Sequence, residues 1–397
     1  MSLATLFEGF DTLLLSLALP YLGREFGVDA AASGTAVGTI NLGTVLAFVP
    51  VRLADRYGRR PMLLVAVAGY TLATVATAAT QSLGSFIALQ VVARMFMVTE
   101  IGLAYVILSE EMPARLRGRA NAFMVAFAGL GGIAASLSFA PVVESRLGWR
   151  GLYLLGGALL PLLPVYWWQI RETQRFRAAR AAGSVPSFWG ELAATREVFR
   201  RDQLRSTLTA SALWFCISVW TGATVFWFTF YAVKERGWDP ALVGRVLPLA
   251  AGIGLAGYAV VGAAMDFVGR RFAAVLFLAL GAASTVVCFT AESTTTIAVS
   301  YVAVMLLQAV WSVIGTITSE IFPTALRATA NAVSNNLIGR TGMVLSGFLV
   351  GGLSVGLAGS VGNAVALLAV APLVAIPVVL CCVPETRGRA LEEIARA

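Results

Sequence analysis

The sequence predicts an all-α integral membrane protein with twelve transmembrane helices. Of its 397 residues, 58% are hydrophobic and only 13% are charged, whereas a soluble domain carries about 25% charged residues. Apolar runs of about 20 residues, each long enough to cross about 30 Å of hydrocarbon, recur along the whole chain. Because these runs are continuous rather than alternating, they predict helices and exclude the strands of a transmembrane barrel.

The apolar runs place these helices in two groups of six. The first run starts almost at Met1 and lacks a basic region or cleavage site, which predicts a span rather than a signal peptide. The predicted helices lie near 3–23, 34–51, 62–80, 84–108, 119–141, 150–170, 206–232, 241–264, 272–290, 296–318, 329–352 and 360–383. We therefore expect a six-helix bundle over 1–170, a central loop over 171–205 and a second six-helix bundle over 206–397.

The basic residues predict the orientation in the membrane. Arginines cluster in alternate loops and in the central segment, whereas the opposite loops hold few basic residues. This bias predicts that both termini are cytoplasmic. We also expect the protein to lie in a cytoplasmic (inner) membrane. The net charge of +8 is thus explained by basic residues in the loops that face the cytoplasmic side of the lipid bilayer. We expect no nucleic-acid partner.

Composition also limits the chemistry. The chain has no histidine, and its four cysteines lie in apolar runs. We see no metal cluster and no nucleophile–base pair, so we expect no metal, no cofactor and no enzymatic activity. Any proton chemistry must use carboxylates, because histidine, the usual proton carrier near neutral pH, is absent.

Three polar motifs recur at offsets close to half the chain. Asp55–Arg60 is echoed by Asp266–Arg271, and Glu172-Thr173 by Glu385-Thr386. The turn containing Ser109, Glu110, Pro113 and Arg117 matches the turn containing Ser319, Glu320, Pro323 and Arg327. Each half has an even number of spans, so the halves should be parallel repeats with a binding site between them near the midplane.

These motifs resemble the major facilitator superfamily along the entire chain. The loop Asp-Arg-x-Gly-Arg-Arg is that superfamily's hallmark, although Val51 replaces its first glycine and Phe267 replaces a basic residue in the second copy. The resemblance implies alternating access and a gating role for the charged turns. The predicted gating residues are Asp55, Arg59, Arg60, Glu110, Arg117, Asp266, Arg270, Glu320 and Arg327.

Further motifs indicate branches of the superfamily. The tail from Pro384 to Ile394 looks like that of sugar porters and organic-ion transporters. Phe7–Thr12 in the first span and Asn335–Gly342 in the eleventh are similar to aromatic-acid:proton symporters. The antiporter pattern of the fifth span is missing, because Pro141 lies far from Gly129, Gly131 and Gly132.

Four charged residues in the first half predict proton coupling: Asp11, Glu8, Glu100 and Arg94. A charge at the bilayer centre costs at least about 3 kcal/mol, so such residues are functional by default. Arg94 and Glu100 point about 120° apart on their helix, since each residue turns it by about 100°. Arg94 should therefore meet Asp11 or substrate, and Glu100 either Arg340 or a proton; a structural ion pair is the alternative.

Other residues predict where substrate binds. Arg340 can grip a carboxylate with its planar guanidinium, and Asn336 lies one turn away; an internal ion pair is the alternative. Gln90 and Tyr105 share the Arg94 face. Trp220, Thr224, Trp227 and Tyr231 form one stripe on the seventh span, which either walls a pocket for a ring or packs against other helices.

The sequence thus predicts a secondary active transporter with H⁺ as the coupling ion. Three acids face two arginines, and the surplus carboxylate should take up a proton when an anionic substrate occupies Arg340. We expect symport of a small organic carboxylate by a monomer, with aromatic acids among the candidate substrates. The open alternatives are a sugar or polyol symporter or facilitator, efflux of amphipathic compounds, and a membrane sensor without transport.

Overall fold

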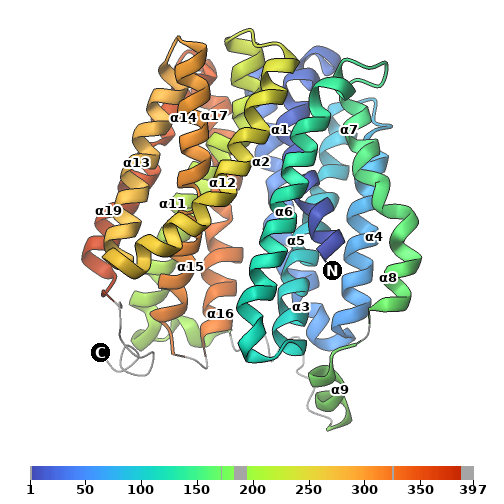
Figure 1. Cartoon of the computed structure of the whole chain (residues 1–397), viewed down its shortest axis with the longest axis vertical. Coiled ribbons are helices and arrows are strands. Elements are labelled where there is room, and N and C mark those ends of the chain that lie inside the picture. Colours follow the sequence, from blue (N-terminus) through green and yellow to red (C-terminus); the bar gives the residue numbers. More distant parts are fainter. Residues whose placement is uncertain (1, 171, 183–194, 324–325, 386–397) are drawn as a thin grey trace. The chain divides into compact units, whose positions relative to one another are not determined.

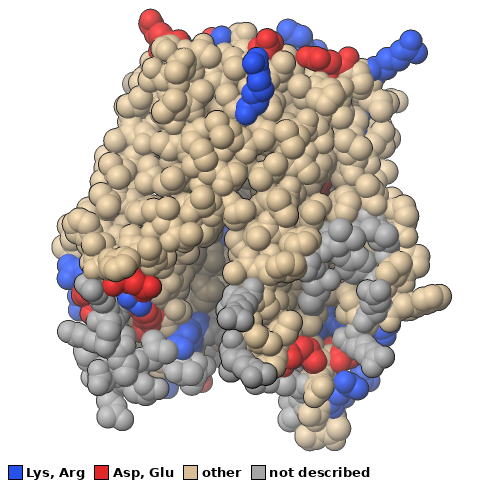
Figure 2. All heavy atoms as spheres, viewed as in Figure 1, with Lys and Arg blue, Asp and Glu red and all other residues tan. Residues whose placement is uncertain are grey.

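The computed structural model describes residues 2–170, 172–182, 195–323 and 326–385. These residues form helices and connecting turns without strands. Eleven helical stretches within them are long and apolar enough to span a membrane. On the face drawn in Figure 2, charged side chains gather at the two ends of the helices and leave an uncharged band between. The predicted all-helical membrane fold is confirmed.

The first half begins with α1 and ends with the short helix α9. Its helices, shown in Figure 1, are α1 (Ser2–Phe26), α2 (Ala30–Leu46), α3 (Phe48–Tyr57), α4 (Arg59–Thr77), α5 (Leu83–Glu111), α6 (Ala114–Val143), α7 (Trp149–Gly156), α8 (Leu163–Gln169) and α9 (Gln174–Ala181). The predicted sixth span is not one regular helix, because a 3₁₀ segment at Gly157–Leu162 separates α7 from α8. Pro161 inside that segment cannot donate a backbone hydrogen bond.

The second half contains two π-helical segments that the sequence pattern did not predict. Its elements are η2 (Arg196–Phe199), α11 (Arg201–Phe230), η3 (Tyr231–Glu235), α12 (Pro240–Val268), α13 (Arg270–Thr290), α14 (Thr294–Leu307), α15 (Val310–Glu320), α16 (Arg327–Asn331), η4 (Ala332–Gly339), α17 (Thr341–Val355), α18 (Val361–Leu368) and α19 (Val370–Cys382). The segments η3 and η4 are π-helices, a form that often occurs at functional sites.

The chain folds into two compact units. One comprises Met1–Phe26 and Thr39–Ala193, and the other comprises Gly27–Gly38 and Ala194–Ala397. The second unit includes the start of α2 because glycines there pack on α17: a Cβ on Gly34 would lie 2.5 Å from the Cα atom of Gly351. Such small residues let two helix backbones approach closely. The division differs from the expected 1–170 bundle in two places: it assigns residues 27–38 to the second unit and extends the first unit to residue 193.

Within the first unit, α1 packs along α6 and α4 packs along α5. Buried side chains between these helices include Tyr70, Met97 and Val98. In the second unit, α11 packs along α17 and α19, and a larger apolar core surrounds Trp220 and Ile314. Both units therefore hold buried cores into which polar side chains from several helices project.

Candidate functional site

Asp11 is the centre of a buried polar cluster in the first unit. The Thr74 hydroxyl on α4 donates a hydrogen bond of 2.6 Å to Asp11 Oδ2. Arg94 on α5 is also buried and interacts electrostatically with Asp11. The other oxygen, Asp11 Oδ1, has no hydrogen-bond partner among the described residues. The predicted grouping of Asp11 with Arg94 is thus present, and Thr74 joins it.

Two glycines lie so close to Asp11 and Arg94 that a larger side chain would contact them. A Cβ on Gly156, at the end of α7, would lie 3.0 Å from Asp11 Oδ1. A Cβ on Gly43 of α2 would lie 2.9 Å from the Cβ atom of Arg94. Because any larger residue would press on the charged side chains, these glycines fix how closely the helices surround them. The sequence did not identify either position.

Glu8 and Glu100 form a second buried acidic group in the first unit. Both side chains are buried, and they interact electrostatically with each other. Thr12 donates to the Glu8 carbonyl oxygen at 2.9 Å and lies 3.3 Å from Glu8 Oε1. Glu100 Oε2 accepts no hydrogen bond from any described residue. Like charges repel strongly away from water, so a proton shared here would stabilise the pair.

Tyr70 is the residue that sequence reasoning missed in this group. It lies on α4 one helical turn before Thr74, so both project from the same face. Its side chain is fully buried, and it interacts electrostatically with Glu100, Asp11 and Glu8. Its hydroxyl oxygen has no hydrogen-bond partner in the described part of the chain. No sequence motif marked Tyr70, because its importance comes from neighbours on α1 and α5.

The predicted group of Gln90, Arg94 and Tyr105 is only partly reproduced. Gln90 is buried near Arg94 on α5 and donates to the Thr77 hydroxyl at 3.1 Å. Tyr105 is 38% exposed. Eleven residues return a helix to the same face but also move about 16 Å along its axis, so Tyr105 shares the face of Arg94 without sharing its surroundings.

The stripe on α11 and η3 is buried, which favours the packing alternative that the sequence left open. Trp220, Trp227 and Tyr231 are all fully buried. Trp220 Nε1 donates to the Thr285 hydroxyl at 2.8 Å, and Arg236 Nε donates to the Tyr231 hydroxyl at 2.7 Å. The interpretation of these three rings as pocket walls therefore receives no support.

A polar network beside this stripe was not predicted. The Thr221 hydroxyl donates to Gln308 Oε1 at 2.7 Å, and Gln308 Nε2 donates to the Thr224 hydroxyl at 3.1 Å. Trp311 Nε1 donates to the Thr221 hydroxyl at 2.8 Å, and the Trp311 ring lies 5.2 Å from that of Trp214. Thr224, predicted to touch substrate, is thus held through Gln308.

Arg340 and Asn336 come together at the π-helix η4. Arg340 Nε lies 3.4 Å from Asn336 Oδ1 and donates to it. Both side chains are only partly buried. The neighbouring Asn335 Oδ1 is buried and has no partner among the described residues. The predicted pair thus lies at an irregular stretch of backbone: Asn336 is within the π-helix and Arg340 is at its C-terminal end.

The predicted gating residues form equivalent clusters in the two units. In the first, Arg59 pairs with Asp55 at 3.1 Å and with Glu110 at 3.2 Å. In the second, Arg270 lies 3.9 Å from Asp266 and 3.5 Å from Glu320. The repeated motifs therefore fold into repeated ion-pair networks.

Further details of these clusters also repeat. Arg60 donates to the Trp167 carbonyl oxygen at 2.7 Å, and Arg271 donates to that of Leu380. Arg327 makes no ion pair with a described residue, and its Nε is buried without a partner. The Arg117 side chain and residues 386–397 lie outside the described part of the chain.

Comparisons with known proteins identify the family. The Major Facilitator Superfamily profile matches residues 1–347. A Bacillus subtilis protein described as a candidate niacin/nicotinamide transporter is 26% identical over 98% of this chain and 96% of its own length. The gallate transporter of Pseudomonas putida is 28% identical over 61% of this chain and 56% of its own length.

The fold is also that of a solved transporter. The inward-open xylose transporter of E. coli superposes with a TM-score of 0.77 at 17% identity, covering 100% of this chain and 97% of that one. Proteins of this family are transporters rather than enzymes, and they bind small molecules within the membrane. The match over residues 1–347 and the shared fold lead to one conclusion: this chain belongs to the major facilitator superfamily.

Proposed function

We propose that the protein is a proton-coupled symporter of small aromatic carboxylates. The observation that carries this proposal is Asp11, a buried acid with one oxygen bonded to Thr74 and the other without a partner. A buried polar atom without a partner costs about 1–3 kcal/mol, and more when the group is charged. A bound proton would remove the negative charge that makes this burial costly. Arg94 nearby keeps its charge under all ordinary conditions and would stabilise Asp11 once the proton leaves.

The substrate class rests on the second unit and on the relatives. Arg340 presents a guanidinium that matches a carboxylate in shape and charge, and Asn336 holds its Nε. Gallate and niacin, named for two similar proteins, are both aromatic carboxylates. The half-buried Trp311 ring offers a flat surface of the kind on which an aromatic ring packs.

We further propose the cytoplasmic membrane as its location, with both termini in the cytoplasm, and a monomer as the working unit. An arginine cluster in each unit supports this orientation. The arginine clusters around Arg59 and Arg270 occupy the turns after α3 and α12, and cytoplasmic loops are the ones enriched in arginine.

The test replaces Asp11 by Asn, which resembles a permanently protonated carboxyl. In proteoliposomes with an imposed pH gradient, Asp11→Asn should abolish accumulation of nicotinate or gallate. Counterflow, in which unlabelled substrate drives entry of labelled substrate, should persist because it needs no proton release. Accumulation by the variant equal to that of the wild type would contradict the proposal, as would accumulation of sugars in preference to acids.

A further inference from the structure

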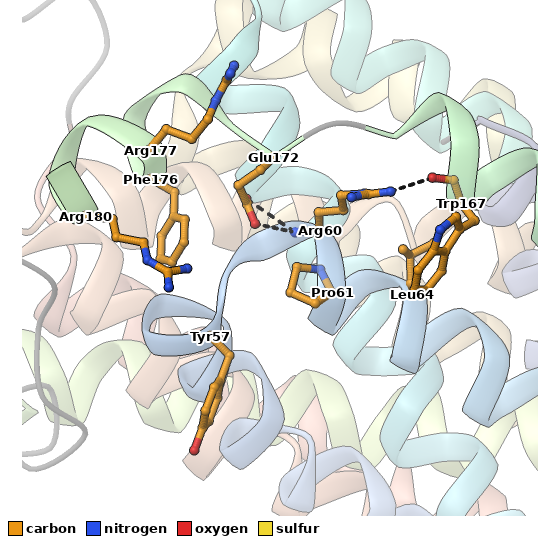
Figure 3. Close-up of a pocket in the computed structure, with 9 residues that line it drawn as sticks. All are labelled: Tyr57, Arg60, Pro61, Leu64, Trp167, Glu172, Phe176, Arg177 and Arg180. Carbon is orange, nitrogen blue, oxygen red and sulfur yellow. Dashed lines mark hydrogen bonds between the residues drawn. The ribbon is translucent and has the colours of Figure 1, made fainter.

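A basic pocket lies at the arginine-rich end of the first unit, away from the buried acids. It has a volume of about 370 Å³. Figure 3 shows its lining, which comes from the end of α3, from the first two turns of α4, from α8, and from α9 with the residues before it. The lining residues are Tyr57, Arg60, Pro61, Leu64, Trp167, Glu172, Phe176, Arg177 and Arg180.

The pocket carries a net positive charge, because arginines outnumber acids in its lining. Its single acid, Glu172, is already used: Oε1 accepts from the backbone N of Arg59 at 3.0 Å, and Oε2 accepts from that of Arg60 at 3.3 Å. A carboxylate at a helix N-terminus is partly balanced by the helix dipole. The lining arginines are therefore not neutralised by Glu172.

Arg60 and Arg180 bring guanidinium groups to this pocket. Arg60 donates to the Trp167 carbonyl oxygen and stacks over that indole, which holds its positive charge at the Trp167 side of the pocket. Arg180 is exposed on α9 and is in no ion pair with a described residue. In Figure 3 Arg180 turns toward the pocket, whereas Arg177 points away from the other labelled side chains.

The apolar part of the pocket indicates which anion fits. Pro61, Leu64 and Phe176 line it beside Trp167. Trp167 is 59% exposed and Trp168 is 85% exposed at the end of α8, and exposed indoles of this kind mark the membrane–water interface. A soluble anion would use only the arginines, whereas a phospholipid would also place its glycerol and upper acyl chains on the apolar wall.

We propose that this pocket binds the phosphate-bearing headgroup of an acidic phospholipid, separately from the transported substrate. Basic pockets beside membrane helices are the sites that recognise such headgroups. The bound headgroup would bridge Arg60 on α4 to Arg180 on α9. It would thereby attach the segment after α8 to the start of α4.

The test titrates the full chain in detergent with three probes: dioctanoyl phosphatidylglycerol, dioctanoyl phosphatidylcholine and inorganic phosphate. Binding is followed by tryptophan fluorescence, and Trp167→Phe should remove the signal. Phosphatidylglycerol should bind about tenfold more tightly than the other two. The choline cation of phosphatidylcholine would be repelled by the arginines, and inorganic phosphate lacks the acyl chains that cover the apolar wall. Arg180→Gln should weaken phosphatidylglycerol binding about tenfold.

Arg201→Gln is the matched control, since it removes one exposed arginine outside the pocket. It should leave phosphatidylglycerol binding unchanged. Equal loss in both arginine variants would overturn the proposal, because only general charge attraction would then be acting. Equal affinity for phosphatidylcholine would also overturn it, and equal affinity for inorganic phosphate would assign the pocket to a soluble anion.

Discussion

At the scale of single residues, the chemistry depends on neighbours that lie far apart in sequence. The sequence identified Asp11, Glu8, Glu100 and Arg94 from their charge in apolar runs, and all four are buried in one unit. It could not identify Thr74 or Tyr70, because polar and aromatic residues are common in membrane helices. Only the packing of α4 against α5, with α1 nearby, shows that these two approach the acids.

Tyr70→Phe tests whether the Tyr70 hydroxyl takes part in proton coupling. Its hydroxyl has no partner among the described residues, so its loss should change the melting temperature by less than about 2 °C, since no hydrogen bond is broken. Proton-driven accumulation should fall about tenfold if the hydroxyl donates to one of the neighbouring carboxylates during transport, because a hydrogen bond to a charged group is worth at least about that factor. Tyr301→Phe is the control, because Tyr301 is buried in the second unit against Phe228. Equal effects of the two variants on accumulation would refute this role for Tyr70.

At the scale of elements, hydropathy predicted where helices lie but not where they are irregular. The π-helices η3 and η4 and the 3₁₀ break after α7 leave no mark in apolar periodicity, since they change hydrogen-bond partners rather than side-chain type. The stripe of Trp220 and Tyr231 was likewise predicted as one face, but periodicity cannot say whether that face meets a pocket or another helix.

Repeated turns position the helix starts in both units. Gly58 and Gly269 have φ angles of 113° and 91°, which favour glycine. Glu172 accepts from the first backbone N–H groups of α4, as Glu385 does for α13. The sequence echo of Glu172 and Glu385 was visible, whereas their role in capping those helices was not.

Glu172→Gln tests this element-scale account. The carboxamide keeps the shape but loses the charge that the N-terminus of α4 stabilises, so the free energy of unfolding should fall by about 1 kcal/mol. Thermal unfolding of the purified protein would show this as a lower melting temperature. Glu144→Gln, at the C-terminal end of α6, should have no such effect. An unchanged melting temperature for Glu172→Gln would contradict the capping role.

At the scale of the whole molecule, the duplicated motifs of the two halves explain why the charged clusters could be predicted from the sequence. Arg59 and Arg270 occupy matching motifs and form matching ion-pair networks with acids four residues earlier and on a neighbouring helix. The buried charged residues proposed to bind the proton and the substrate do not repeat in the two units. The acids with Arg94 lie in the first unit, and Arg340 with Asn336 lies in the second, which assigns proton and carboxylate to different units in our proposal.

Direct measurement of proton movement with substrate tests the central claim most sharply. A pH-sensitive dye trapped inside proteoliposomes would report on the lumen after nicotinate or gallate is added outside without an imposed gradient. We predict that the lumen acidifies faster than in protein-free vesicles, and that Asp11→Asn removes this excess. Substrate entry through the wild-type protein without excess acidification would contradict proton symport.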